Sequence, residues 1–260
     1  LNTSAMDITI IGAGNVGSHL ALTLHQAGYT IQQVYSRQLS KARPLAEHVD
    51  AAPIHQLSAV SPESALCLLA VKDDAIRTVA QSLSAHLPKT TLLAHTSGAT
   101  PSSVLSDAWA NWGVFYPLQT LTKGQPADFT QIPMCIDGAT PAIQQALQEI
   151  AGRISHQVHL VNDEQRATLH LAAVFINNFT NAMLQASHTL TEEAHLPRDI
   201  LKPLLRATIQ KGTRQEPRKA QTGPAIRRDQ QTIERHLGQL ANHPELSTVY
   251  KAITSYIQTF

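Results

Sequence analysis

A glycine-rich turn near the start of the chain limits its possible folds more than any other feature. The segment Gly12 to Gly17 (GAGNVG) follows the apolar run Ile8 to Ile11 and leads into a helical pattern from Ser18 to Ala27. In such a strand–turn–helix unit, the first glycine permits a tight turn, the second lets a diphosphate approach the backbone, and the third allows close packing of helix on strand. The helix N-terminus adds free N–H donors and a positive dipole end. We therefore predict that a dinucleotide binds at Gly12, Gly14, Asn15, Val16 and Gly17.

Short apolar runs alternate with longer mixed stretches up to about Asp137, as expected for strands that alternate with helices. The run Leu66 to Val71 is apolar at every position, which is typical of a strand covered by helices on both faces. These patterns predict an α/β fold whose N-terminal part, residues 6–161, is a doubly wound, mostly parallel sheet of the Rossmann type. The expected strands are 8–11, 31–35, 65–71, 91–95, 113–116, 134–136 and 157–161.

The pattern changes after residue 161, and residues 162–260 are expected to form an all-α domain. Asp163 to about His195 contains no Pro or Gly and predicts one long helix. Because its apolar residues surround most of the helix, we expect neighbouring helices or a second subunit to bury it, and hence a homodimer through the C-terminal helices. Shorter helices should follow, separated at Gly212, Glu216-Pro217, Thr222 to Pro224 and His243-Pro244. Leu1 to Ala5 are interpreted as a ragged start or expression remnant.

Composition narrows the class of protein. The 260 residues are 43% hydrophobic and 15% charged, which excludes a disordered chain. Twenty Lys and Arg against 19 Asp and Glu give no overall field that would attract nucleic acid or an anionic membrane. No apolar run reaches the ~18 residues of a membrane span. Cys67 and Cys135 lie in separate apolar runs, which predicts buried reduced thiols. A cytoplasmic protein with a small-molecule substrate is expected.

The end of the second expected strand bears on cofactor choice. About 20 residues after the glycine turn, NAD sites usually carry an acidic residue for the ribose 2′-hydroxyl. This chain has Tyr35-Ser36-Arg37 there instead. A guanidinium and a hydroxyl can hold a 2′-phosphate by charge-assisted hydrogen bonds, with Ser40 and Lys41 close by. We therefore predict NADP, with Ser36 and Arg37 at the 2′-phosphate; the alternative is that Arg37 is only a solvated residue.

Two further strand ends should lie at the same edge of the sheet, where ligands bind in open α/β folds. Val71, Lys72 and Ser97 are expected to line the nicotinamide side. His95 is a candidate proton donor because an unperturbed imidazole titrates near neutrality; the alternative is a histidine that merely caps a strand. Tyr116 or Gln119, at the next strand end, could reach a substrate.

With these motifs and a helical second half, nearly the whole chain resembles the superfamily of β-hydroxyacid dehydrogenases and pyrroline-5-carboxylate reductases. The N-terminal half also resembles deazaflavin-dependent NADP oxidoreductases. Thr222 to Asp229 (TGPAIRRD) followed by His236 is similar to an uncharacterised bacterial family of Rossmann-like proteins. The resemblance implies NADP(H)-dependent hydride transfer with a small carbonyl, imine or deazaflavin-type substrate in an interdomain cleft.

The resemblance also bears on the long helix. Hydroxyacid dehydrogenases carry a Lys-x-x-Asn-Asn motif there, and the matching stretch here is Val174 to Asn178. Val174 cannot transfer a proton. The resemblance therefore implies only the substrate-positioning role of the motif, which would belong to Asn177. His170, one turn earlier, is a candidate replacement. His170, Asn177, Asn181 and His188 fall within about 20° of one line, which indicates either a hydrated face or the wall of a substrate cleft.

Thr222-Gly223-Pro224 predicts a helix start with Pro in the first turn. Arg227 and Asp229 would then face the cleft, where Arg227 could hold a substrate carboxylate; the alternative is a cap with surface ion pairs. Ten Lys and Arg but only four Asp and Glu lie between Arg198 and Arg235, which favours an acidic substrate. No aromatic residues are interleaved, so nucleic acid is not expected.

The sequence contains neither a His-Glu-x-x-His motif nor paired Cys-x-x-Cys motifs, so no metal site is predicted. The rival to the oxidoreductase hypothesis is a non-catalytic NADP(H)-binding sensor or scaffold, because Val174 replaces the lysine.

Overall fold

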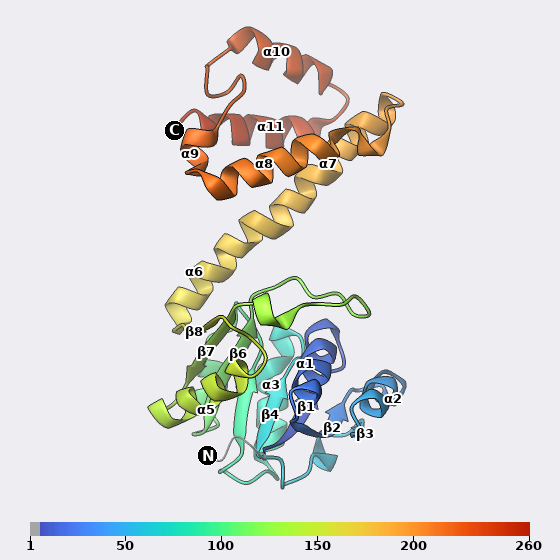
Figure 1. The fold of residues 1–260 in the computed structure, drawn as a ribbon, viewed down its shortest axis with the longest axis vertical. Helices are drawn as coiled ribbons and strands as arrows, with labels where there is room; N and C mark the ends of the chain where they lie inside the picture. The colour runs from blue at the N-terminus through green and yellow to red at the C-terminus, as the bar shows by residue number, and fades with distance from the viewer. Residues whose placement is uncertain (1–5) are drawn as a thin grey trace. The chain divides into compact units, whose positions relative to one another are not determined.

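The computed structural model describes residues 6–260, so the interpretation of Leu1 to Ala5 lies outside the described residues. Eight strands form one sheet in the order β3-β2-β1-β4-β5-β6-β7-β8 (Figure 1). All neighbours are parallel except β6 and β7. The strands are β1 (Asp7–Ile11), β2 (Thr30–Tyr35), β3 (Ala52–Ile54), β4 (Leu66–Leu69), β5 (Leu92–His95), β6 (Trp112–Pro117), β7 (Met134–Gly138) and β8 (Val158–Leu160).

The doubly wound, mostly parallel sheet is therefore confirmed, and seven of its strands coincide with expected runs. The short edge strand β3 was missed, because three residues with a central proline carry almost no strand signal.

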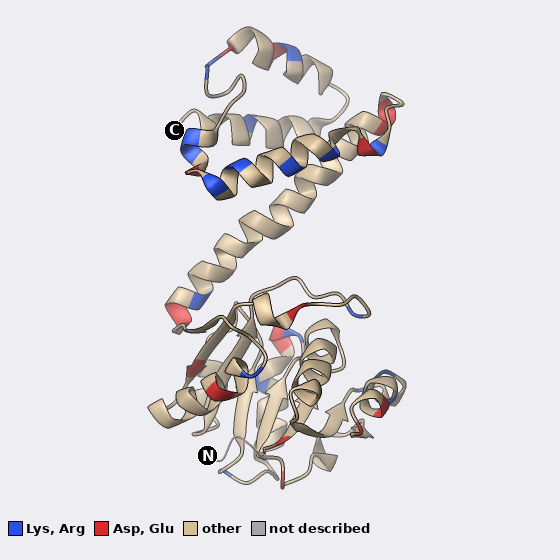
Figure 2. Ribbon diagram, in the orientation of Figure 1, with Lys and Arg blue, Asp and Glu red and all other residues tan. Residues whose placement is uncertain are grey.

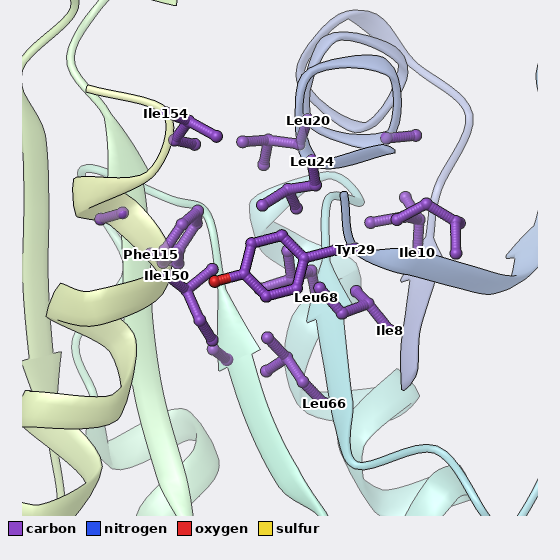
Figure 3. Close-up of a cluster of buried hydrophobic side chains, with 14 of the residues drawn as sticks. Ile8, Ile10, Leu20, Leu24, Tyr29, Leu66, Leu68, Phe115, Ile150 and Ile154 are labelled. Carbon is purple, nitrogen blue, oxygen red and sulfur yellow. The ribbon is translucent and has the colours of Figure 1, made fainter. Parts of the chain in front are cut away.

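Alternate residues of each strand pack against helices on opposite faces of the sheet. Leu66 and Leu68 join one buried cluster with α1 (Asn15–Gln26), α2 (Leu39–His48) and α5 (Pro141–Gly152). Cys67 and Leu69 join a second cluster with α3 (Asp73–Ser84) and α4 (Ser103–Ser106). Figure 3 shows Leu20 and Leu24 of α1 meeting Leu66, Leu68 and Ile150 around Tyr29. Cys67 and Cys135 are buried and free, as expected.

The long helix is confirmed, with one irregularity. The chain is helical without a break from Asp163 to Glu193, but the five residues of the π-helical segment η4 (Phe175–Phe179) separate α6 (Asp163–Val174) from α7 (Thr180–Glu193). The compact units of the chain run to Asn178 and from Phe179 to Phe260. Arg166 and His170 of α6 form hydrogen bonds with Thr100 and Tyr116 of the first unit. The expected domain boundary at 161/162 stays a prediction.

The second unit is all-helical, as expected. After α7 it contains η5 (Arg198–Leu201), α8 (Lys202–Arg214), α9 (Pro217–Ala220), α10 (Gln230–Gln239) and α11 (Pro244–Ile257). Gly212 lies inside α8 rather than ending a helix, since one glycine costs a helix only about 1 kcal/mol.

The expected helix start at Thr222 is wrong: α10 begins at Gln230. Gly223 and Arg228 have φ values of 108° and 54°, which no right-handed helix accommodates.

Burial of the long helix is not achieved within the described chain. Leu171, Ile176 and Leu184 are 58%, 77% and 40% exposed. Within residues 6–260, no helix combines the length and apolar character needed to cross a membrane.

Candidate functional site

Two of the three motif glycines are required by the fold itself. Gly12 has a φ of 124°, and a β-carbon there would collide with the carbonyl oxygen of Ala70, which directly follows β4. A β-carbon at Gly17 would collide with the Gly12 carbonyl. The turn therefore passes so close to the end of β4 that neither Gly12 nor Gly17 has room for a side chain.

The remaining glycine of the motif, Gly14, has no such structural reason. Gly14 is exposed with an ordinary φ of −82°, and a β-carbon there would meet no heavy atom within 4 Å. As the N-cap of α1, it offers no side chain to the first N–H groups of the helix, and the first turn carries no acidic residue. The start of α1 thus combines open space with uncapped donors, which is the arrangement that binds a diphosphate.

The neighbouring strand ends flank this turn. Ser36 and Arg37 follow β2, Val71 and Lys72 follow β4, and both strands are paired with β1. Arg37 and Lys72 are exposed, whereas Ser36 and Val71 are half-buried. The Oγ atom of Ser36 accepts the N–H of Gln38 at 3.4 Å. The structure therefore brings these expected cofactor residues together at the carboxyl ends of β2, β1 and β4.

His95 does not fit the role expected for it. Its side chain is fully buried, and its Nδ1 accepts the N–H of Ser97 at 3.2 Å. Burial, assisted by the charge of Arg166 and opposed by Asp163, lowers the pKa of His95 to about 3. The expectation of titration near neutrality is wrong here, because burial of the ring disfavours its charged form. The proton of the neutral ring resides on Nε2, which has no hydrogen-bond partner among the described residues.

Ser97, expected beside the nicotinamide, is also buried. Its Oγ accepts the N–H groups of Ala99 and Thr100 at 3.2 and 3.0 Å. The hydroxyl therefore shapes the turn after β5.

A buried arginine that sequence reasoning missed joins α6 to this turn. Arg166 is 1% exposed, and its Nη2 donates to the carbonyl of Thr100 at 2.7 Å and to Asp163 at 2.6 Å. Asp163 also accepts the N–H and the hydroxyl of Ser102, each at 2.8 Å. Burial alone would raise the pKa of Asp163, but the hydrogen bonds from Ser102 and Arg166 hold it below its usual value. This network fixes the start of α6 against the end of β5.

Past this network, the hydroxyl of Tyr116 and the Nδ1 of His170 form a hydrogen bond of 3.3 Å. Both side chains pack over Gly98, where a β-carbon would lie 2.6 Å from the Tyr116 ring. Burial raises the pKa of Tyr116, with Cys135 and Asp73 adding to the effect and Arg166 opposing it, so its hydroxyl stays protonated. The pair lines a hollow of about 430 Å³ together with Gln119 and Asn177. Asn177 lies in η4, and π-helical turns are frequent at functional sites.

The expected substrate residues of the second unit have a local structural explanation. Asp229 is the N-cap of α10 and accepts the N–H of Thr232 at 3.1 Å, a bond that holds the pKa of Asp229 below its usual value. Arg227 is exposed. His236 bonds through Nδ1 to the hydroxyl of Tyr250 at 2.9 Å. Their roles toward a substrate stay predictions. Over the described part of the chain, no three His, Cys, Asp or Glu side chains gather as metal ligands.

Comparisons with known proteins agree with this architecture. Residues 1–117 match a Rossmann-like domain, and residues 132–257 match a domain of unknown function, DUF2520. The crystal structure of BF3122, a candidate NADP oxidoreductase from Bacteroides fragilis, is 37% identical, with 100% of both chains covered and a TM-score of 0.92. Protein TM1727 from Thermotoga maritima shares the fold, at 21% identity, 97% coverage of both chains and a TM-score of 0.73.

A curated relative is the uncharacterized oxidoreductase YfjR of Bacillus subtilis. It is 32% identical over 190 residues, which cover 70% of this chain and 64% of the Bacillus protein. The chain belongs to the family of two-domain proteins that join a Rossmann-like domain to a DUF2520 domain.

Proposed function

We propose that the chain is an NADP(H)-dependent oxidoreductase whose cofactor diphosphate binds at Gly12, Gly14, Asn15, Val16 and Gly17. One observation carries the proposal: the fold gives no reason for a glycine at position 14, whereas an anion at the uncapped start of α1 gives one. The names of the Bacteroides and Bacillus relatives support it.

Ser36 and Arg37 are proposed to hold the 2′-phosphate of NADP. In support, Arg37 is exposed at the end of β2, and no acidic residue lies between Tyr35 and Lys41 to favour an unphosphorylated ribose. Arg37→Ala should weaken NADPH binding by about tenfold or more, the value of one charge-assisted hydrogen bond, and leave NADH binding unchanged. Arg43→Ala, an exposed arginine on α2, is the matched control. Equal losses for both nucleotides would contradict the assignment.

The hollow beside Tyr116 and His170 is proposed to take a small carbonyl or imine. NADPH, when bound, supplies the hydride, with Val71, Lys72 and Ser97 on its nicotinamide side. Asn177 positions the substrate, and His170, held by the Tyr116 hydroxyl, transfers the proton that Val174 cannot. His170→Gln should lower kcat while leaving the Kd of NADPH unchanged. An unchanged kcat would remove His170 from the chemistry.

The rival function is a non-catalytic NADP(H) sensor, which Val174 favours because it occupies the position where the resembling dehydrogenases carry lysine. Turnover separates the two. We expect oxidation of NADPH with at least one of a panel of keto acids, imines and deazaflavins. NADPH binding without turnover across that panel would favour the sensor.

A second copy of this chain is proposed to cover the exposed apolar residues of the long helix. Light scattering at micromolar concentration should give twice the monomer mass, and a monomer would contradict this proposal. Basic residues gather along α8 and α9 (Figure 2), which supports an acidic substrate with Arg227 on its carboxylate. The two buried free thiols suit a reducing, cytoplasmic compartment.

A further inference from the structure

The connection between β6 and β7 folds onto the start of α1 (Figure 1). Three hydrogen bonds join one turn of this connection to α1 and the glycine turn. The backbone N–H of Lys123 donates to Asn15 Oδ1 at 3.1 Å, and its Nζ donates to the carbonyl of Ala13 at 3.3 Å. The carbonyl of Thr122 lies 3.0 Å from Nε2 of His19 on α1. A cation from a distant part of the sequence therefore lies beside the motif that we assign to the diphosphate.

The turn that carries Lys123 is well defined. The N–H of Gln125 donates to the carbonyl of Thr122 at 3.0 Å, and Gly124 has a φ of 82°. This arrangement is typical of a type II turn, in which glycine takes the third position and Lys123 the second. Leu121 and Phe129, on either side, are buried in the core cluster that contains α1. The fold thus holds Lys123 in place at the glycine turn.

The positive charges at the start of α1 have no negative partner when no anion is bound there. The start of α1 carries roughly half a positive charge, and the ammonium of Lys123 adds a full one next to it. Lys123 has no carboxylate within ion-pair distance among residues 6–260, and the first turn of α1 contains no acid. A diphosphate carries two negative charges, which the helix end alone does not balance. The ammonium of Lys123 supplies most of the remaining positive charge beside the glycine turn.

We propose that Lys123, from the β6–β7 connection, binds the cofactor diphosphate directly beside the glycine turn. The inference rests on the proposed function and adds a residue outside the glycine motif. Because NADPH and NADH share the diphosphate, Lys123 contributes affinity for both and does not distinguish between them. Arg37, at the 2′-phosphate, does distinguish them.

The test compares Lys123→Met with the wild-type chain by titration with NADPH, NADH and adenosine 2′-monophosphate. The Kd values for NADPH and NADH should both rise by about tenfold or more, as expected for loss of a charged hydrogen bond. The affinity for adenosine 2′-monophosphate, which lacks the diphosphate, should stay unchanged. Lys251→Met on α11, an exposed lysine far along the chain, controls for the loss of one charge.

A second variant tests whether Lys123 binds the cofactor or only holds the turn in place. Lys123→Gln keeps a donor for the Ala13 carbonyl and removes the charge, so it should bind NADPH as weakly as Lys123→Met. Wild-type affinity in Lys123→Gln, or in Lys123→Met, would overturn the assignment of Lys123 while leaving the proposed function intact. If the wild-type chain bound neither nucleotide, the proposed function itself would fail.

Discussion

The helices α1 and α6 belong to the same unit but begin in opposite ways. The start of α6 is closed by its own sequence: Asn162 and Gln165 form a full capping box, and Asp163 and Glu164 occupy the first turn. The start of α1 has Gly14 as its cap, no side-chain bond and no acid. Asp163 additionally accepts three hydrogen bonds from Ser102 and Arg166.

We propose that this difference separates polar groups with a structural role from those that bind the cofactor. At α6 the Asn162–Gln165 capping box and the Asp163–Arg166 ion pair both lie within the chain, so the helix start is part of the framework. The buried Nε and Nη1 atoms of Arg166 have no hydrogen-bond partner among the described residues. At α1 the donors are left open and Lys123 adds an unpaired positive charge. Substitutions at α6 should therefore change stability, whereas substitutions at α1 should change cofactor affinity.

At neutral pH the largest expected effect on stability is at the capped start of α6. Asp163→Asn leaves the buried Arg166 guanidinium without its carboxylate, and should lower the free energy of unfolding by about 3 kcal/mol or more. Glu164→Gln removes the same charge from the neighbouring exposed position and should change stability by less than about 0.5 kcal/mol. Urea denaturation measures both. Equal effects would show that the pair of Asp163 with the buried Arg166 is not what fixes α6.

The buried His95 should make the free energy of unfolding depend on pH. Its pKa is about 3 in the folded state, against an ordinary value of 6.5, so the unfolded chain binds its proton first as pH falls. The contribution of neutral His95 is present above pH 6.5 and is lost progressively between about pH 6.5 and 3. His95→Gln should flatten the pH dependence of unfolding free energy in this window by up to about 1.4 kcal/mol per pH unit. Parallel slopes for the two proteins would contradict the burial of His95.

The smallest effect concerns the α6 cap itself. Asn162→Ala removes the acceptor for the N–H of Gln165, which it binds at 2.9 Å, and should cost about 1 kcal/mol of stability. The affinity for NADPH should not change. A loss of affinity without a loss of stability would reverse the distinction between the two helix starts.

The parts of the site that are local in sequence could be predicted, and the parts made by distant contacts could not. The glycine turn, the strand ends at Ser36 and Val71, and the long helix each have a pattern within a few residues. Arg166 reaches Thr100 across 66 positions, and Lys123 reaches Ala13 across 110. Nothing in the residues around either one signals its partner.

The helix start of the second unit fails for a different reason. Two start signals stand close together, Thr222-Gly223-Pro224 and Asp229, and the sequence does not rank them. The positive φ of Arg228 decides in favour of Asp229, because it interrupts any helix that begins earlier. For His95, a neutral pKa is a fair expectation for the residue type, and only its burial overturns it.

The most direct test of the proposed diphosphate site at the start of α1 is Gly14→Asp, which places a capping carboxylate at the position proposed for the diphosphate. Calorimetric titration with NADPH and thermal unfolding are measured on the same preparation. We expect the melting temperature to stay the same or rise, because aspartate caps α1 without a steric clash, and NADPH affinity to fall by about a hundredfold or more. Wild-type NADPH affinity in this variant would contradict the account.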